Sequence, residues 1–289
     1  MKRGLPVPPP SSSAPAPGAR PRPGFPARLP AAAPAPVPRN QLQPRPAARA
    51  VAPPPPPQPK AVPRVPAHPV APTGVGMESQ AVRAAMVRKI QGQGVTHPGV
   101  LGALMAVERH RFVDSALVNQ AYEDTSLPIG LGQTISKPGV VARMLELLCQ
   151  GRQEKLGRVL EIGTGCGYQA ALLSHLARDV YSIERLKGLH EKSRENLRWF
   201  RLSNLHLLFG DGMLGYARGA PYAAIIAAAG GDDIPQAWID QLAVGGRLVA
   251  PAVTSAGRQN LVVVDKTATG IVRTELEAVL FVPLKSGIA

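Results

Sequence analysis

Acidic residues are absent from the first quarter of the chain. Residues 1–76 contain 10 Lys and Arg and 25 of the 32 prolines, but no Asp or Glu, and Phe25 is their single aromatic residue. A segment with so few large apolar side chains cannot bury enough surface to offset the entropy of ordering it. We therefore expect residues 1–76 to be a disordered, basic Pro/Ala/Arg-rich tail, and residues 77–289 to form one folded domain. A solvated linker, or a true translation start at Met77, would explain the same tail.

Long hydrophobic runs and paired cysteines are also missing. No run approaches the roughly 20 apolar residues of a membrane-spanning helix, and no apolar stretch follows Lys2 and Arg3 as it would in a secretory signal. Cys149 and Cys166 are too few for a disulfide framework or a metal site. The net charge of +14 lies mostly in the tail, because residues 77–289 carry 23 basic against 19 acidic residues. We expect a cytoplasmic monomer with no membrane partner, no specific nucleic-acid partner and no metal.

The folded part shows strands that alternate with helices. Helical spacing covers 78–93, 98–108 and 138–150, and the last two segments open with a proline in the first turn. Short apolar runs of β type follow at 158–162, 180–183, 205–209, 222–228 and 246–250. Two more such runs, 260–265 and 276–282, have no helix between them. This order predicts a doubly wound parallel sheet with a C-terminal β-hairpin and an N-terminal helical cap.

A glycine-rich turn ends the first of these strands. Gly163, Gly165 and Gly167 follow an apolar run and precede a helical pattern, which is the nucleotide-binding half of a doubly wound sheet. A dinucleotide fingerprint would have its third glycine where Tyr168 stands, so a pyrophosphate is not expected. Glu161, just before the first glycine, suits a ligand with a positive amino group. S-adenosylmethionine has that group, a ribose and no phosphate; an ordinary strand–loop–helix without a ligand is the alternative.

Polar residues at other strand ends should meet this turn, because ligands bind beyond the carboxyl ends of the strands in such sheets. Glu184, 21 residues after Gly163, can accept the hydroxyl hydrogens of a ribose. Asp211, between two glycines, can accept from an adenine amino group, although Gly-Asp-Gly is usually a turn. Small residues at 227–231 would leave space over the ligand.

Residues 127–139 form a polar, glycine-punctuated segment before the helix at 138–150. We expect a loop here. Ser136 precedes Pro138 by two residues, so the simplest role for its hydroxyl is to cap that helix.

From about Ala81 to Leu284 the sequence resembles one family, protein-L-isoaspartate (D-aspartate) O-methyltransferase. The resemblance rests on nine motifs, which stand at 111–114, 121–124, 127–136, 159–169, 180–185, 210–212, 221–226, 245–249 and 281–284. The glycine turn alone would indicate only a methyltransferase, and Gln133-Thr-Ile-Ser136 narrows the family. The fold implied is the Rossmann-like sheet of the class I S-adenosylmethionine-dependent methyltransferases.

The resemblance implies a repair activity on aged proteins and peptides. The family methylates the free α-carboxylate of L-isoaspartyl residues, and the ester recloses to a succinimide that hydrolyses partly to normal aspartate. A carboxylate is already ionised at neutral pH, so no general base is required. This agrees with the lack of a convincing His or Cys nucleophile constellation in the sequence. Acceptance of D-aspartyl residues is left open.

The resemblance also assigns roles to residues of this chain. Ser136 would position the substrate carboxylate by a hydrogen bond, and Thr134 and Ile135 would belong to the same substrate loop. The residues expected to bind S-adenosylmethionine are Glu161, Gly163, Thr164, Gly165, Glu184, Arg185, Asp211 and Gly212.

The chain departs from the family pattern at three places. Ala228 stands where the family has a hydroxyl side chain, residues 230–235 replace a commoner proline-containing loop, and Cys166 replaces a frequent serine. Two other functions therefore stay open: methyl transfer to a small molecule or RNA, and a non-catalytic binding module. The nearly neutral domain with few aromatic residues disfavours RNA, the retained Glu161, Glu184, Asp211 and Ser136 disfavour the binding module, and Tyr168 disfavours a dehydrogenase.

Overall fold

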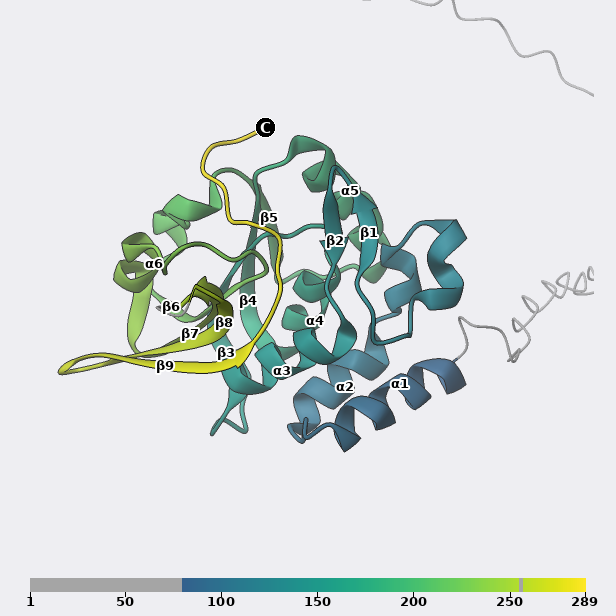
Figure 1. The fold of residues 1–289 in the computed structure, drawn as a ribbon, viewed down its shortest axis with the longest axis horizontal. Coiled ribbons are helices and arrows are strands. Elements are labelled where there is room, and N and C mark those ends of the chain that lie inside the picture. Colours follow the sequence, from purple (N-terminus) through teal and green to yellow (C-terminus); the bar gives the residue numbers. More distant parts are fainter. Residues whose placement is uncertain (1–79, 255–256) are drawn as a thin grey trace, which may run out of the picture. The chain divides into compact units, whose positions relative to one another are not determined.

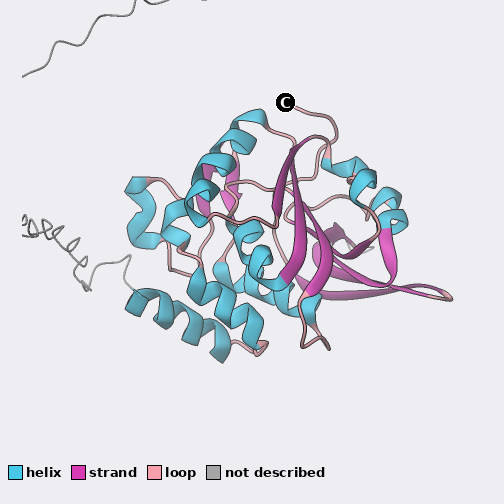
Figure 2. Cartoon of the chain, turned by 180° about the vertical axis from the view of Figure 1, so that it is seen from behind, coloured by secondary structure: helices cyan, strands magenta, loops and turns pink. Residues whose placement is uncertain are grey.

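A computed structural model describes residues 80–254 and 257–289. The proposed tail, residues 1–76, lies outside the described residues, and so do residues 77–79 at the start of the proposed domain. The described chain is an α/β structure with seven strands in one twisted sheet and helices on both faces (Figures 1 and 2).

The strands are β3 (Leu156–Ile162), β4 (Ala177–Glu184), β5 (Leu205–Phe209), β6 (Tyr222–Ala227), β7 (Leu242–Val253), β8 (Gln259–Thr267) and β9 (Gly270–Ala278). Their order in the sheet is β5-β4-β3-β6-β7-β8-β9. The strands β3 to β7 are parallel to one another. β8 pairs antiparallel with β7, and β9 pairs antiparallel with β8. The expected doubly wound sheet and its closing hairpin are confirmed. The strand order reverses between β3 and β6, which is where ligands bind in such sheets.

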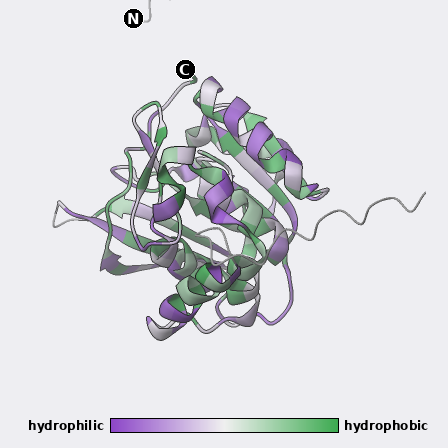
Figure 3. Ribbon diagram, turned by 90° about the vertical axis from the view of Figure 1, so that its right-hand side faces the viewer, coloured by the Kyte–Doolittle hydropathy of each residue, from purple (hydrophilic) through white to green (hydrophobic). Residues whose placement is uncertain are grey.

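The helices are α1 (Gln80–Gly92), α2 (Pro98–Ala106), α3 (Pro138–Cys149), α4 (Tyr168–Leu176), α5 (Lys187–Leu197) and α6 (Gln236–Gln241). Short 3-10 turns include η1 (Arg109–Phe112) and η2 (Ser115–Gln120). The helices that face the viewer in Figure 3 mix hydrophilic and hydrophobic residues, as expected for elements with one buried face. The expected N-terminal helical cap is α1 and α2, which pack on each other and on α3, while α2 also packs on α4.

Two hydrophobic clusters hold these layers together. Alternate side chains of a strand point to opposite faces, so Val159 belongs to the cluster that contains residues of α1 to α5, while its neighbour Leu160 belongs to the cluster that contains Trp238 of α6. The central strand β3 is buried along its last four residues. Continuous burial of this kind explains why an unbroken apolar run marked the strand in the sequence.

Two expected elements differ from the sequence prediction. Residues 127–139 are not simply a loop, because β1 (Leu127–Gly130) and β2 (Gln133–Ile135) pair as an antiparallel hairpin. Gly130, Leu131 and Gly132 all have positive φ at its turn, and a leucine there gives no turn signal in the sequence. The last strand also ends at Ala278, short of the predicted 282, because Val282 and Leu284 instead bond to Gly230 beyond the end of β6.

Candidate functional site

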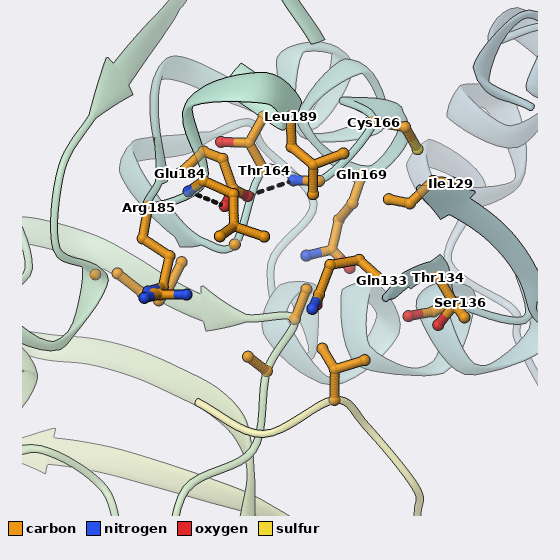
Figure 4. Close-up of a pocket in the computed structure, with 18 of the residues that line it drawn as sticks. Ile129, Gln133, Thr134, Ser136, Thr164, Cys166, Gln169, Glu184, Arg185 and Leu189 are labelled. Atoms are coloured by element: carbon orange, nitrogen blue, oxygen red, sulfur yellow. Dashed lines mark hydrogen bonds between the residues drawn. The ribbon is translucent and has the colours of Figure 1, made fainter. Parts of the chain in front are cut away.

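A cavity of about 230 Å³ lies beyond the carboxyl ends of the parallel strands, between the sheet and the β1–β2 hairpin. Figure 4 shows Thr134 and Ser136 on one side of it and Glu184 and Arg185 on another. Nine of the eleven residues predicted for the site line it: Thr134, Ile135, Ser136, Gly163, Thr164, Gly165, Glu184, Arg185 and Gly212. Glu161 and Asp211 are not part of the lining.

The glycine turn curls back onto the end of β4. The N–H groups of Gly163 and Thr164 donate to the Ile183 carbonyl at 2.9 and 3.2 Å. Gly163 and Gly165 have φ angles of 89° and 56°, which other residues adopt at a cost. Thr164 is buried, and its hydroxyl is 2.6 Å from the hydroxyl of Ser182. The main chain therefore forms one wall of the cavity, with few side chains in front of it.

Glu184 is fixed by two backbone donors at the end of β4. The N–H groups of Gly165 and Leu186 donate to its two carboxylate oxygens, each at 2.9 Å (Figure 4). A carboxylate has about four acceptor positions, so two stay available on the cavity side. Glu184 lines the cavity, and its contact with a ribose stays a prediction.

Glu161 lies behind the cavity wall and not in it. Its side chain is fully buried, and the Ser182 hydroxyl donates to Oε2. Burial raises the pKa of Glu161 to about 8, against the opposing effect of this bond. The side-chain amide of Gln169, which lines the cavity, hydrogen-bonds to Glu161 and also opposes the rise in its pKa. Gln169 therefore connects the buried carboxyl group of Glu161 to the surface of the cavity.

Asp211 is engaged by the chain itself. Its carboxylate accepts from the N–H of Met213 at 2.9 Å and from the N–H of Gly287 at 2.6 Å. Arg185 Nε donates to the Gly287 carbonyl at 2.8 Å, so the last residues run along this side of the cavity. The adenine contact expected for Asp211 stays a prediction, and adenine would share that carboxylate with Gly287.

The Ser136 hydroxyl does not cap α3. The cap residue of α3 is Lys137, with no side-chain bond to the helix, and the N–H of Gly139 donates to Asp124 Oδ1 at 2.9 Å. The cap is therefore supplied by Asp124, fifteen residues earlier, and the capping role expected for Ser136 is wrong. Within residues 80–254 and 257–289 the Ser136 hydroxyl has no hydrogen-bond partner.

Sequence reasoning missed one wall of the cavity. Val282 to Lys285 line it because Val282 and Leu284 form backbone bonds with Gly230 at 2.9 and 2.8 Å. The signal was present as an apolar run ending in Pro283, which looked like the continuation of a strand. Gln169, one residue after Tyr168, was missed as well.

Comparison with known proteins identifies the family that has this arrangement. The family model described as protein-L-isoaspartate(D-aspartate) O-methyltransferase matches residues 81–289. A protein-L-isoaspartate O-methyltransferase of Methylibium petroleiphilum is 60% identical over 219 residues, which are 75% of this chain and 81% of the relative. The chain belongs to the protein-L-isoaspartate(D-aspartate) O-methyltransferase family.

Solved structures agree with this membership. A protein-L-isoaspartate O-methyltransferase structure superposes with a TM-score of 0.64 at 26% identity, covering 71% of this chain and 67% of the other. A Plasmodium falciparum protein in complex with S-adenosyl-L-homocysteine has a TM-score of 0.60 at 23% identity and covers 70% and 98%. The similarity to the Plasmodium falciparum protein is evidence for the fold alone.

Two of the three departures from the family pattern, Ala228 and Cys166, line the same cavity, whereas residues 230–235 do not. Ala228 lines it, and a Cβ built on Gly163 would meet the Ala228 methyl at 3.7 Å. Cys166 also lines it and is a free, buried thiol whose pKa burial raises to about 11. Such a thiol is protonated and unreactive at neutral pH, so it serves here as a small side chain.

Two negative findings concern the part of the chain that the structure describes. No group of three or more His, Cys, Asp or Glu is placed to hold a metal ion. None of the helices there has the length and apolar character needed to cross a bilayer.

Proposed function

We propose that this chain methylates the free α-carboxylate of L-isoaspartyl residues in damaged proteins and peptides, with S-adenosylmethionine as methyl donor. Family membership and the arrangement of the cavity support this together. The observation that supports the proposal most strongly is that the glycine turn, Glu184 and Ser136 all line one cavity. The hydroxyl of Ser136 has no hydrogen-bond partner among the described residues. The glycine turn and Glu184 suit the cofactor, and the hydroxyl suits a carboxylate acceptor.

The residues present fit the cofactor. Glu184 would accept from the ribose hydroxyls, and the main chain at 163–165 would contact the amino acid portion. The amide of Gln169, which lines the cavity, would meet a polar end of that portion. When bound, S-adenosylmethionine supplies an activated sulfonium methyl group.

The protein's own part is to bind, align and exclude water. The substrate carboxylate is ionised at neutral pH, so nothing has to remove a proton from it. Ser136 Oγ would donate a hydrogen bond to one carboxylate oxygen and thereby fix the direction of the other. Ile129, Val282 and Leu284 line the cavity with apolar surface that would keep water from the reacting atoms.

We propose further that the active species is a cytoplasmic monomer whose domain is residues 77–289. The cytoplasm agrees with two cysteines that are both unpaired. The partners proposed are isoaspartyl proteins and peptides.

The test is methyl transfer from labelled S-adenosylmethionine to two peptides that differ only in Asp versus isoAsp. We expect label in the isoaspartyl peptide alone, as a base-labile ester. Equal labelling of both peptides, or of neither by a protein that still binds S-adenosylhomocysteine, would contradict the proposal. A third peptide with D-Asp measures the second substrate class.

A further inference from the structure

Arg109 is a buried cation that contacts no carboxylate among the described residues, although the charge of Asp124 acts on it from a greater distance. Its side chain is fully buried in η1, and it forms no ion pair within the described chain. Removing a guanidinium from water is costly unless its donors are satisfied. Nη1 of Arg109 has no hydrogen-bond partner among the described residues, so the groups bound by its other nitrogens show what the buried guanidinium does.

Two of those donors hold backbone carbonyl groups from separate segments. Nε donates to the Ala121 carbonyl at 2.8 Å, and Nη2 donates to the Ser136 carbonyl at 2.9 Å. Ser136 lies between the end of β2 and the start of α3, and its side chain has no bond of its own. The bond from Arg109 therefore fixes the peptide group next to the Cα atom that bears the Ser136 side chain.

The same guanidinium also contacts the cofactor side of the cavity. Its central carbon lies 4.8 Å from the centre of the Tyr168 ring, and a cation over an aromatic face is attracted to it. Tyr168 is the first residue of α4, directly after the glycine turn, and it lines the cavity. Phe112, from the same 3-10 turn as Arg109, packs edge-on against Tyr168 at 5.5 Å.

We propose that Arg109 is a positioning residue that fixes the Ser136 hydroxyl relative to the glycine turn. It touches neither reacting group and acts through the Ser136 carbonyl and the Tyr168 ring. This inference rests on the proposed function only for the identity of the acceptor. Misplacing a reacting group by about an ångström can cost roughly a hundredfold in rate, so a single lost contact here should be visible in turnover.

The test compares R109M and R109K with R158M and R158K. Arg158 is a matched control, because Nη1 donates to the Gly219 carbonyl at 2.6 Å and the guanidinium lies 5.9 Å from the Tyr181 ring, outside the cavity lining. R109M removes the charge at similar volume, and R109K keeps the charge but cannot reach both carbonyls in one plane. The measurements are kcat and KM on an isoaspartyl peptide, the Kd of S-adenosylhomocysteine, and thermal unfolding.

We expect kcat to fall about tenfold or more in both Arg109 variants, while their Kd for S-adenosylhomocysteine stays within about threefold of the parent value. In both Arg158 variants we expect kcat, KM and Kd all to stay within about threefold of the parent values. A folded Arg109 variant with kcat within about threefold, or an equal fall in the Arg158 variants, would overturn the proposal. So would failure of both Arg109 variants to fold while the Arg158 variants fold, because Arg109 would then be structural.

Failure of the proposed function would look different. The parent protein would then label no isoaspartyl peptide, and backbone NMR relaxation of residues 133–137 with bound S-adenosylhomocysteine would be the readout. We expect greater motion of these residues in R109M than in R158M. Equal motion would overturn the positioning role.

Discussion

Ser136 carries the hydroxyl group that decides the residue-scale account of this site. Its oxygen lines the cavity, while the cap of α3 is supplied by Asp124 and the Ser136 carbonyl is held by Arg109. Nothing in the described structure uses the hydroxyl, so removing it should leave the fold unaffected. A hydrogen bond to a charged acceptor contributes about 1.5–3 kcal/mol.

We therefore expect S136A to lower kcat by about 10- to 100-fold with little change in the Kd of S-adenosylhomocysteine. Steady-state kinetics and isothermal titration calorimetry measure the two quantities. The control is S126A, because Ser126 is exposed and outside the cavity. Collapse of cofactor binding with unchanged turnover of the bound enzyme would contradict this role.

Glu161 links pH to stability. Its ordinary pKa of 4.5 rises to about 8 in the folded protein because the carboxyl group is buried. The folded state therefore holds a proton that the unfolded state loses between these values. Stability without ligand should fall as pH rises from about 4.5 to about 8, by at most about 1.4 kcal/mol per pH unit, and level off above that range.

The E161Q variant lacks this titration, so its melting temperature should gain on that of the parent as pH rises through the same window. Thermal scans from pH 5 to pH 9 measure the difference. A constant difference across this range would show that Glu161 is ionised in the folded protein at every pH tested.

At the scale of elements, α3 depends on a residue outside it. Pro138 begins the helix, and Gly139 N–H donates to Asp124 Oδ1. We expect D124A to lower the free energy of unfolding by about 1–2 kcal/mol, as lost caps do. Urea unfolding measures it, with E123A as the exposed neighbouring control. An unchanged D124A, or a comparable loss in S136A, would return the cap to Ser136.

The elements also show which features the sequence could predict. The parallel strands were found because both faces of β3 and its neighbours are buried, so apolar runs are unbroken. The β1–β2 hairpin was missed because Leu131 takes a positive φ that only its surroundings enforce. The end of the last strand was predicted wrongly because a segment that covers a cavity contains the same apolar residues as a strand packed in a sheet. The contact of Arg109 with Ser136 joins residues 27 apart, which no local pattern reports.

On the scale of the whole molecule, the residues that build the cavity all lie between 129 and 285. A chain beginning at Met77 contains them all together with α1 and α2. We expect it to keep the kcat/KM of the full chain on isoaspartyl peptides within about twofold, and to keep its melting temperature. Side-by-side kinetics and thermal scans measure this. A large loss of activity in a chain that melts normally would show that residues 1–76 take part in substrate binding.

The central position of β3 in the sheet determines how activity should be lost when the protein is heated. This strand has β4 on one side and β6 on the other, and it ends at the glycine turn. The centre of a sheet opens only when the sheet as a whole comes apart, so amide hydrogens there exchange last. The turn is attached to that slowest-opening strand. Thermal inactivation and global unfolding should therefore be a single cooperative event, with no folded but inactive species between them.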